Sequence, residues 1–316
     1  MAPPLRIVYF GTPEFAVPTL RTLLASRHTV AGVVSQPDRP RGRGHRLVAT
    51  PTKTLAVLCG VPVLQPARLR DERFLADIRA LHADLGVVAA YGRILPDALL
   101  EIPPLGMINV HASLLPRYRG AAPVHRAVIA GESETGVTIM RVVHDLDAGG
   151  MMAAGRRPIG PDETSPEVER DLAELGATLL AGVVDQLAEG RATEIAQDGA
   201  LATYAPKILK TEGVADWTLP ARAIHNRVRG LQPWPLVSVH IGEARYLLHR
   251  TEVVDETATA PPGTVVSARG DLLTIAAGDG RLLRVLQIQP EGRRAMSARD
   301  FLAGHAIAPG TRLDAT

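Results

Sequence analysis

The sequence predicts an α/β protein with two domains: a doubly wound, mainly parallel sheet of the Rossmann type, followed by a smaller antiparallel β-barrel. Residues 1–206 alternate short apolar runs with amphipathic stretches, whereas residues 207–316 hold short β-like runs separated by turn signals. A length of 316 residues also suits two hydrophobic cores better than one. We therefore place the domain boundary at the end of a Pro-, Gly- and polar-rich linker, residues 191–206.

The first domain is expected to begin with a buried strand, LRIVYF, and a turn, GTPEF, that leads into a helix. Further strands are expected at 29–35, 61–65, 84–91, 106–111 and 136–143, and further helices at 50–60, 71–82 and 165–190. Thr50 and Pro51 form a plausible cap and first turn of a helix. Ligands bind beyond the carboxyl ends of the strands in such sheets, so His111 is predicted to emerge at the ligand edge.

The second domain is expected to contain a helix at 219–232 and then only short strands. These strands are predicted at 235–241, 244–254, 263–268, 272–278 and 281–289. Even spacing of short strands between turns is typical of a small antiparallel barrel.

The composition is that of a globular protein, with 46% hydrophobic and 22% charged residues. The single cysteine, Cys59, excludes an internal disulfide framework and fits a reducing compartment. Its apolar surroundings, LAVLCG, predict that Cys59 is buried. No apolar run reaches the roughly 18 residues that span a bilayer, and the N-terminus does not resemble a secretory signal, so we expect a soluble, cytoplasmic protein.

The segment GMINVHASLLPRYRGAAPVHRA, residues 106–127, carries the strongest chemical signal. Asn109 and His111 are two residues apart on a strand and share one face, so an amide donor and an imidazole could converge on one reacting carbon. A buried Asn–His pair that satisfies its own hydrogen bonds is the equally plausible structural alternative. Ser113 lacks a GxSxG elbow and a base placed by motif, which argues against a nucleophilic role.

Asp147 follows the predicted strand 136–143 in the sequence HDLDAGGMM and is a further candidate for the same site. The sequence around Asp147 is also an ordinary turn, so a purely structural role is the alternative. No spacing of His, Cys, Asp and Glu matches a metal site, and no metal is expected.

The loop SQPDRPRGRGHRL, residues 35–47, is strongly basic. Its positive side chains are those of Arg39, Arg41, Arg43 and Arg46, beside His45, with only one acidic residue, Asp38. A solvated mobile loop is the simplest interpretation, but Gly-spaced arginines after a strand also suit contact with nucleic acid. The turn GTPEF has neither a GxGxxG motif nor a Walker lysine, which argues against a nucleotide cofactor.

Taken together, these motifs resemble the folate-dependent formyltransferase family, and the resemblance covers nearly the whole chain. INVHASLLPRYRGAAP and LDAGGMM are similar to the family-wide signature, which the glycinamide ribonucleotide, sugar-nucleotide and formyl-folate hydrolase branches share. GTPEFAVP, the loop QPDRPRGRG, YAPKI and QPWP narrow the resemblance to the methionyl-tRNA branch. That branch implies a formyltransferase-type Rossmann domain and an OB-like C-terminal barrel that holds tRNA.

The resemblance implies roles for particular residues. Asn109, His111 and Asp147 match the catalytic residues of the family. The folate-binding positions are Ser113, Leu114, Leu115 and Pro116 in one turn, and Arg93, Ile94 and Leu95 in the stretch whose backbone meets the pterin. Arg43 matches the loop arginine that reaches the end of the acceptor stem, with Arg39, Arg41 and Arg46 as further tRNA contacts; His45-Arg46 replaces a frequent Lys pair.

The implied reaction transfers the formyl group of 10-formyltetrahydrofolate to the α-amino group of methionyl initiator tRNA, without a metal. The substrate amine is the nucleophile, Asn109 and His111 would stabilise the oxyanion, and Asp147 would hold His111 in its useful protonation state. We expect a monomer. Two rivals remain at this point: a formyltransferase for an amino-sugar nucleotide, and a catalytically silent RNA-binding protein of the same fold.

Overall fold

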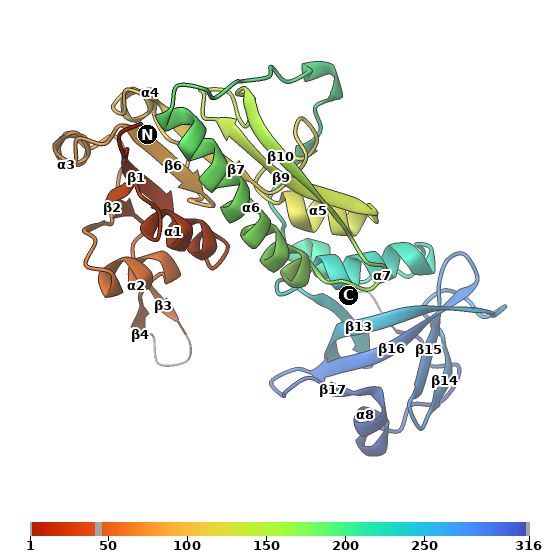
Figure 1. The fold of residues 1–316 in the computed structure, drawn as a ribbon. Helices are drawn as coiled ribbons and strands as arrows, with labels where there is room; N and C mark the ends of the chain where they lie inside the picture. The colour runs from red at the N-terminus through yellow and green to blue at the C-terminus, as the bar shows by residue number, and fades with distance from the viewer. Residues whose placement is uncertain (1, 42–45, 314–316) are drawn as a thin grey trace. The chain divides into compact units, whose positions relative to one another are not determined.

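The computed structural model describes residues 2–41 and 46–313 (Figure 1). Its contacts divide the chain into two compact units. The first holds the residues up to 123 together with 134–157 and 169–205, and the second holds 124–133, 158–168 and the chain from 206 onward.

The first unit is built on a seven-stranded sheet in the order β10-β9-β7-β6-β1-β2-β5. Its strands are β1 (Arg6–Gly11), β2 (Thr29–Val34), β5 (Val63–Leu64), β6 (Leu85–Ala89), β7 (Met107–His111), β9 (Glu134–Arg141) and β10 (Met151–Pro158). The neighbouring strands β5, β2, β1, β6 and β7 are parallel to one another, and β9 runs antiparallel to β7. Their order matches the doubly wound arrangement, which confirms the predicted mainly parallel sheet.

Among the described residues up to 206 the chain forms six α-helices, and the apolar periodicity predicted most of them. They are α1 (Ala16–Leu24), α2 (Pro51–Leu58), α3 (Glu72–Ala80), α4 (Asp97–Leu100), α5 (Pro123–Ala130) and α6 (Ser165–Ala188). Thr50 caps α2 as predicted, because its hydroxyl accepts a hydrogen bond from the Lys53 amide at 3.3 Å. Asp71 caps α3 in the same way through the Arg73 amide.

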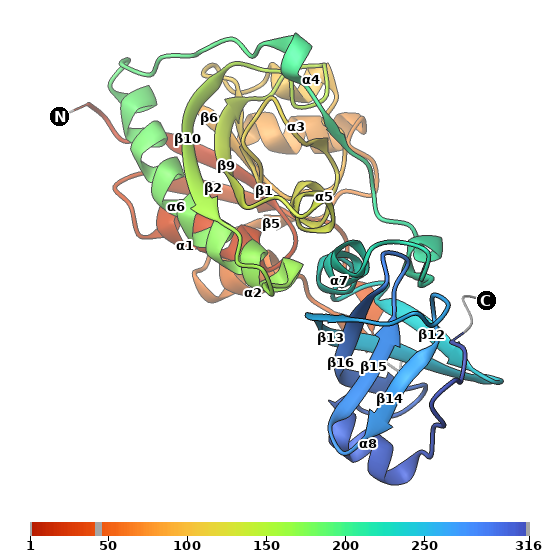
Figure 2. The ribbon, with the colours of Figure 1, turned by 90° about the vertical axis from the view of Figure 1, so that its right-hand side faces the viewer.

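Helices cover both faces of this sheet, and α6 and α3 lie on opposite sides of it (Figure 2). On the α6 side the helix backbone packs closely on the sheet, since a Cβ on Gly176 would lie 2.8 Å from the side chain of Val110. On the α3 side a buried cluster includes Phe74, Leu75 and Ile78 from the helix and Val8, Phe10 and Met107 from the strands. Side chains alternate along a strand, so Asn109 and His111 share the face of Met107, the α3 side.

The second unit contains α7 (Ala221–Gly230), α8 (Ala298–Gly304) and a sheet in the order β12-β13-β16-β15-β14, with β17 paired to β16. Its strands are β12 (Val237–Ile241), β13 (Ala244–Thr257), β14 (Val265–Arg269), β15 (Leu272–Ala276), β16 (Arg281–Pro290) and β17 (Met296–Ser297). All its ladders are antiparallel, as predicted. Among the described residues no ladder joins β12 to β14, so the hydrogen-bonded path of this sheet has two open ends.

Several features differ from the sequence-based expectation. The basic loop contains a short hairpin of β3 (Arg39–Arg41) and β4 (Arg46–Val48) (Figure 1). The expected linker contains β11 (Tyr204–Ala205), which pairs in parallel with β8 (Arg119–Gly120). The prediction that Cys59 is buried is wrong, because it follows the last turn of α2 and is exposed.

Candidate active site

The candidate site lies at the carboxyl edge of the parallel sheet. The strand order reverses between β1 and β6, and such a switch point is where ligands bind in doubly wound sheets. β7 is the next strand after β6, with Asn109 paired to Val88 in register. His111 is the last residue of β7, so both polar side chains lie near the carboxyl end of that strand, as the sequence predicted.

The imidazole of His111 is 5% exposed and has oxygen atoms beside both ring nitrogens. Nε2 lies 3.0 Å from the carbonyl oxygen of Tyr118, and Nδ1 lies 3.6 Å from Oδ2 of Asp147. A carbonyl can only accept, so the first contact assigns a hydrogen to Nε2. Nδ1, which faces the carboxylate, is therefore the ring atom that can gain and lose a proton.

Asp147 reaches the site from the turn between β9 and β10. Its Oδ2 accepts a hydrogen bond of 2.8 Å from the backbone amide of Gly120, and its side chain is 15% exposed. Its φ of 49° lies in the left-handed region that residues other than glycine seldom adopt. The structure thus brings Asp147 to His111 across a sequence separation that no local pattern encodes.

The side-chain amide of Asn109 is open to a ligand. Asn109 is half-buried, and no described residue forms a hydrogen bond with its side chain. The ring of His111 is engaged elsewhere, so the two side chains do not satisfy one another, which was the structural alternative. An amide donor without a protein partner, beside an ionisable ring, can bind an oxygen that becomes negative during a reaction.

The predicted folate-binding turn, Ser113 to Pro116, follows β7 directly. The Ser113 hydroxyl donates to the carbonyl of Arg117 at 2.7 Å, which gives it a structural partner. Leu115 is buried, whereas Leu114 and Pro116 are half-buried. The turn is braced by the fully buried Thr138 of β9, whose hydroxyl donates to the Ser113 carbonyl at 2.8 Å and accepts from the Leu115 amide at 3.2 Å.

Replacing Thr138 with valine should loosen this turn, because Val keeps the shape but neither hydrogen bond. Each buried backbone group left without a partner costs about 1–3 kcal/mol. We expect Thr138→Val to lower the melting temperature and to raise KM for a folate substrate several-fold more than it changes kcat. Thr178→Val, which removes an exposed hydroxyl on α6, is the matched control. An unchanged folate KM in Thr138→Val would show that the turn does not bind folate.

The second predicted folate segment, Arg93 to Leu95, follows β6 at the same sheet edge. Arg93 donates to the carbonyls of Pro66 and Ala67, and Leu95 belongs to the buried cluster on the α3 side. Ile94 is 84% exposed, which is unusual for a large aliphatic side chain and leaves an apolar surface at the ligand edge.

Three of the four predicted tRNA-binding arginines, Arg39, Arg41 and Arg46, lie on β3 and β4. Arg41 pairs in register with Arg46, and Arg39 is exposed and donates to Gln36 at 3.0 Å. Arg43 lies outside the described residues. The chain entering the hairpin is anchored by Asp38, because the Lys53 ammonium and the Gln65 amide bind its carboxylate and hold its pKa below the usual range.

Two residues of the site escaped the sequence analysis. The Gln197 amide bonds to the carbonyls of Asp147 and Gly149 and to the guanidinium of Arg119, which is 8% exposed. Gln197 lies in a polar segment that reads as a linker, and no local signal distinguishes it. Arg119 stands inside the signature segment, where only its burial would have marked it.

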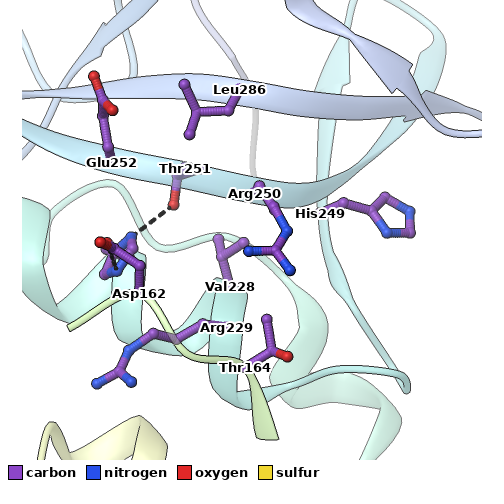
Figure 3. Close-up of a pocket in the computed structure, with 10 residues that line it drawn as sticks. Asp162, Thr164, Val228, Arg229, His249, Arg250, Thr251, Glu252 and Leu286 are labelled. Atoms are coloured by element: carbon purple, nitrogen blue, oxygen red, sulfur yellow. Dashed lines mark hydrogen bonds and ion pairs between the residues drawn. The ribbon is translucent and has the colours of Figure 1, made fainter. Parts of the chain in front are cut away.

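A pocket in the second unit contains none of the predicted site residues (Figure 3). His225 lies at its wall, with Nδ1 3.1 Å from the Thr251 hydroxyl, and burial lowers its pKa. Arg250 is paired with Glu167, and Arg229 donates to backbone carbonyls and to Asn226. These cations already have protein partners, so this pocket is not a candidate for the chemistry.

Within residues 2–41 and 46–313, no three side chains of His, Cys, Asp or Glu are grouped so that they could hold a metal ion. None of the helices in that part is both long and apolar enough to cross a membrane.

Comparison with protein families matches both halves of the chain. Residues 5–184 match the family described as Formyl transferase, and residues 207–306 match Formyl transferase, C-terminal domain. The chain is 46% identical to the methionyl-tRNA formyltransferase of Moorella thermoacetica over 307 residues, 97% of this chain and 98% of that protein. It is 48% identical to that of Pelobacter propionicus, covering 97% and 95% of the two chains.

Solved structures share the fold at low sequence identity. An N-formyltransferase from Helicobacter canadensis, in complex with folinic acid and dTDP-3-aminofucose, matches with a TM-score of 0.66 at 15% identity, covering 91% of this chain and 99% of that one. HypX from Aquifex aeolicus, in complex with tetrahydrofolic acid, matches with a TM-score of 0.63 at 16% identity, covering 94% of this chain and 47% of that one.

Proposed function

Because the chain belongs to the formyl transferase family, we propose that it transfers the formyl group of 10-formyltetrahydrofolate to the α-amino group of methionyl initiator tRNA. The product is N-formylmethionyl-tRNA, which serves translation initiation. Full-length similarity to methionyl-tRNA formyltransferases at about 46% identity supports this acceptor. The observation that carries the chemistry is the placement, at the carboxyl edge of the sheet, of an imidazole, a carboxylate and an amide whose side chain has no hydrogen-bond partner among the described residues.

The reaction needs no nucleophile from the enzyme. The methionyl nitrogen attacks the formyl carbon on N10 of the folate, and the carbonyl electron pair moves onto oxygen. The carbonyl then re-forms, the C–N10 bond breaks and the new C–N bond remains. The amine loses one proton, and N10 gains one. Ser113 has no part in these steps, and its bond to the Arg117 carbonyl is consistent with a structural role.

We assign the three polar residues to these steps. Asn109 donates its amide N–H to the developing oxyanion, and protonated His111 stabilises the same charge. His111 also handles the proton between amine and N10, through Nδ1 or through water. Asp147, 3.6 Å from Nδ1, orients the ring and places its carboxylate charge beside it.

The folate is assigned to the edge formed by two segments. Its pterin meets the backbone of Arg93, Ile94 and Leu95, where exposed Ile94 offers apolar contact, and the turn from Ser113 to Pro116 lines the other side. 10-Formyltetrahydrofolate is a co-substrate, and the proposed reaction uses no metal.

The tRNA is assigned to the hairpin and to the C-terminal domain. Arg39, Arg41, Arg43 and Arg46 contact the acceptor stem, and residues 207–316 hold the tRNA while residues 1–206 perform the transfer. Residues 207–316 carry 14 Arg and Lys against 11 Asp and Glu, and this positive net charge has the sign that a polyanionic partner requires. The protein acts as a monomer in the cytoplasm, where aminoacyl-tRNA and reduced folate are present.

Replacing Arg43 with alanine should raise KM for methionyl-tRNA about tenfold, which corresponds to a loss of about 1.4 kcal/mol, with little change in KM for folate. Arg79→Ala removes the same charge from the last turn of α3, which precedes β6 and so lies at the opposite edge of the sheet. Both variants are compared at one fixed salt concentration, because phosphate contacts are salt-dependent. Equal tRNA kinetics in the two variants would remove Arg43 from recognition.

The acceptor is tested by offering 10-formyltetrahydrofolate with methionyl initiator tRNA or with an amino-sugar nucleotide. We expect formyl-methionine from the first and no formylated sugar from the second. Formylation of the sugar nucleotide alone would overturn the proposed acceptor while leaving the formyl chemistry intact. Absence of product from both would favour a silent RNA-binding protein.

A further inference from the structure

The turn that presents Asp147 is held in an unfavourable conformation. A left-handed φ at a residue other than glycine costs on the order of 1–3 kcal/mol and persists only where the surroundings enforce it. The bond from the Gly120 amide to Oδ2 fixes the carboxylate, but it does not hold the backbone of the turn. Within the turn the Ala148 amide donates to the Asp145 carbonyl at 3.3 Å, which leaves the carbonyl groups of Asp147 and Gly149 to be held from outside the turn.

Gln197 supplies that support through its side-chain amide. Nε2 donates to the carbonyl oxygens of Asp147 and Gly149, both at 2.8 Å. Oε1 accepts from Nη2 of Arg119 at 2.7 Å and from Nε at 3.1 Å. Both hydrogens and both lone pairs of the amide are thus used, so its orientation is fully determined.

These contacts connect β8 to the turn that carries Asp147. The side chain of Arg119 holds Gln197, while the amide of the next residue, Gly120, holds the Asp147 carboxylate. Both residues form β8, which pairs with β11 of the segment that carries Gln197. Gly120 has a φ of 115°, and a Cβ there would lie 2.9 Å from the Ala205 carbonyl, so this approach requires glycine.

We propose that Gln197 is a positioning residue that sets the distance between the Asp147 carboxylate and Nδ1 of His111. This proposal rests on the proposed formyl transfer. At 3.6 Å the carboxylate acts on the ring through charge and orientation, and a displacement of about 1 Å in such a site can cost a hundredfold in rate. The segment expected to be a linker is thereby part of the catalytic unit.

Gln197→Met removes all four bonds at similar volume, and Gln197→Glu keeps the acceptor for Arg119 but loses the donor to the turn. We expect both variants to lower kcat about tenfold to a hundredfold, with both KM values within about twofold of wild type. Asp198→Ala is the matched control, because Asp198 is the neighbouring exposed residue and its carboxylate accepts from the Ala200 amide, outside the contacts of Gln197. If Asp198→Ala lowers kcat equally, or if Gln197→Glu keeps full kcat, the positioning role fails.

A readout without turnover separates this proposal from the proposed function. In ¹⁵N-histidine spectra, with the His111 signal identified by its loss in His111→Gln, Gln197→Met should shift that signal in the direction that Asp147→Ala does. An unchanged signal would overturn the positioning role even in an active enzyme. A shifted signal in a protein that does not formylate methionyl-tRNA would uphold the positioning role and overturn only the proposed function.

Discussion

Asn109→Ala should lower kcat for formyl transfer about a hundredfold to a thousandfold, while binding of methionyl-tRNA is unchanged. The reason is that the Asn109 amide has no hydrogen-bond partner among the described residues and lies on the same strand face as His111. The amide stabilises the formyl oxygen only when that oxygen becomes negative. Removing the amide should therefore lower kcat and leave KM unchanged. Single-turnover rates and a tRNA-binding assay measure the two quantities separately.

Asn109→Asp tests the donor role with a side chain of nearly the same shape. It preserves size and shape but replaces the donor with an acceptor that repels an oxyanion, so we expect at least the loss seen with alanine. A variant that retains full kcat without the amide would contradict the assignment of Asn109 as the oxyanion donor.

His111→Gln should lower kcat by about a hundredfold to ten-thousandfold, the usual contribution of a group that transfers a proton. Glutamine can still donate a hydrogen bond to the Tyr118 carbonyl, as Nε2 does now, but it cannot gain and lose a proton at the position of Nδ1. The variant therefore separates the structural bond from the proton-handling role.

His111→Ala removes both functions and completes the comparison. We expect it to be as slow as His111→Gln and less stable, because the carbonyl of Tyr118 loses its 3.0 Å hydrogen bond from Nε2. Melting temperatures and pre-steady-state rates distinguish the two effects. Near wild-type activity in His111→Gln would show that the imidazole serves only as a hydrogen-bond donor in the site.

The parts of the fold predicted from the sequence are those with a strong local pattern. β1 and β6 are nearly continuous apolar runs, β7 places apolar residues on both sides of Asn109, and the Thr50–Pro51 cap marks the start of α2. β10 was missed because MMAAGRRP has no clear apolar alternation and forms the edge of the sheet. The β3–β4 hairpin was also missed for lack of apolar alternation, because a segment of arginines, glycines and proline is typical of a loop.

The site was predictable only where its residues lie close together in the sequence. Asn109, His111 and the turn from Ser113 to Pro116 share one motif, whereas the contact between His111 and Asp147 depends on how β9 and β10 are joined. Gln197 lies 50 residues beyond Asp147 and contributes through a side-chain amide, a group with no characteristic pattern. Tertiary packing alone gives such a residue its role.

The central claim is that the substrate amine attacks the formyl carbon directly, at a site that contributes no nucleophile. The most direct test mixes the protein with 10-formyltetrahydrofolate carrying a ¹³C-formyl group, with and without methionyl initiator tRNA, and follows the label by mass spectrometry of both macromolecules. We predict that the label passes to the methionyl nitrogen and that the protein carries none in either reaction. A formyl group on Ser113 or any other side chain in the absence of tRNA, or a lack of formyl-methionine in its presence, would contradict the account.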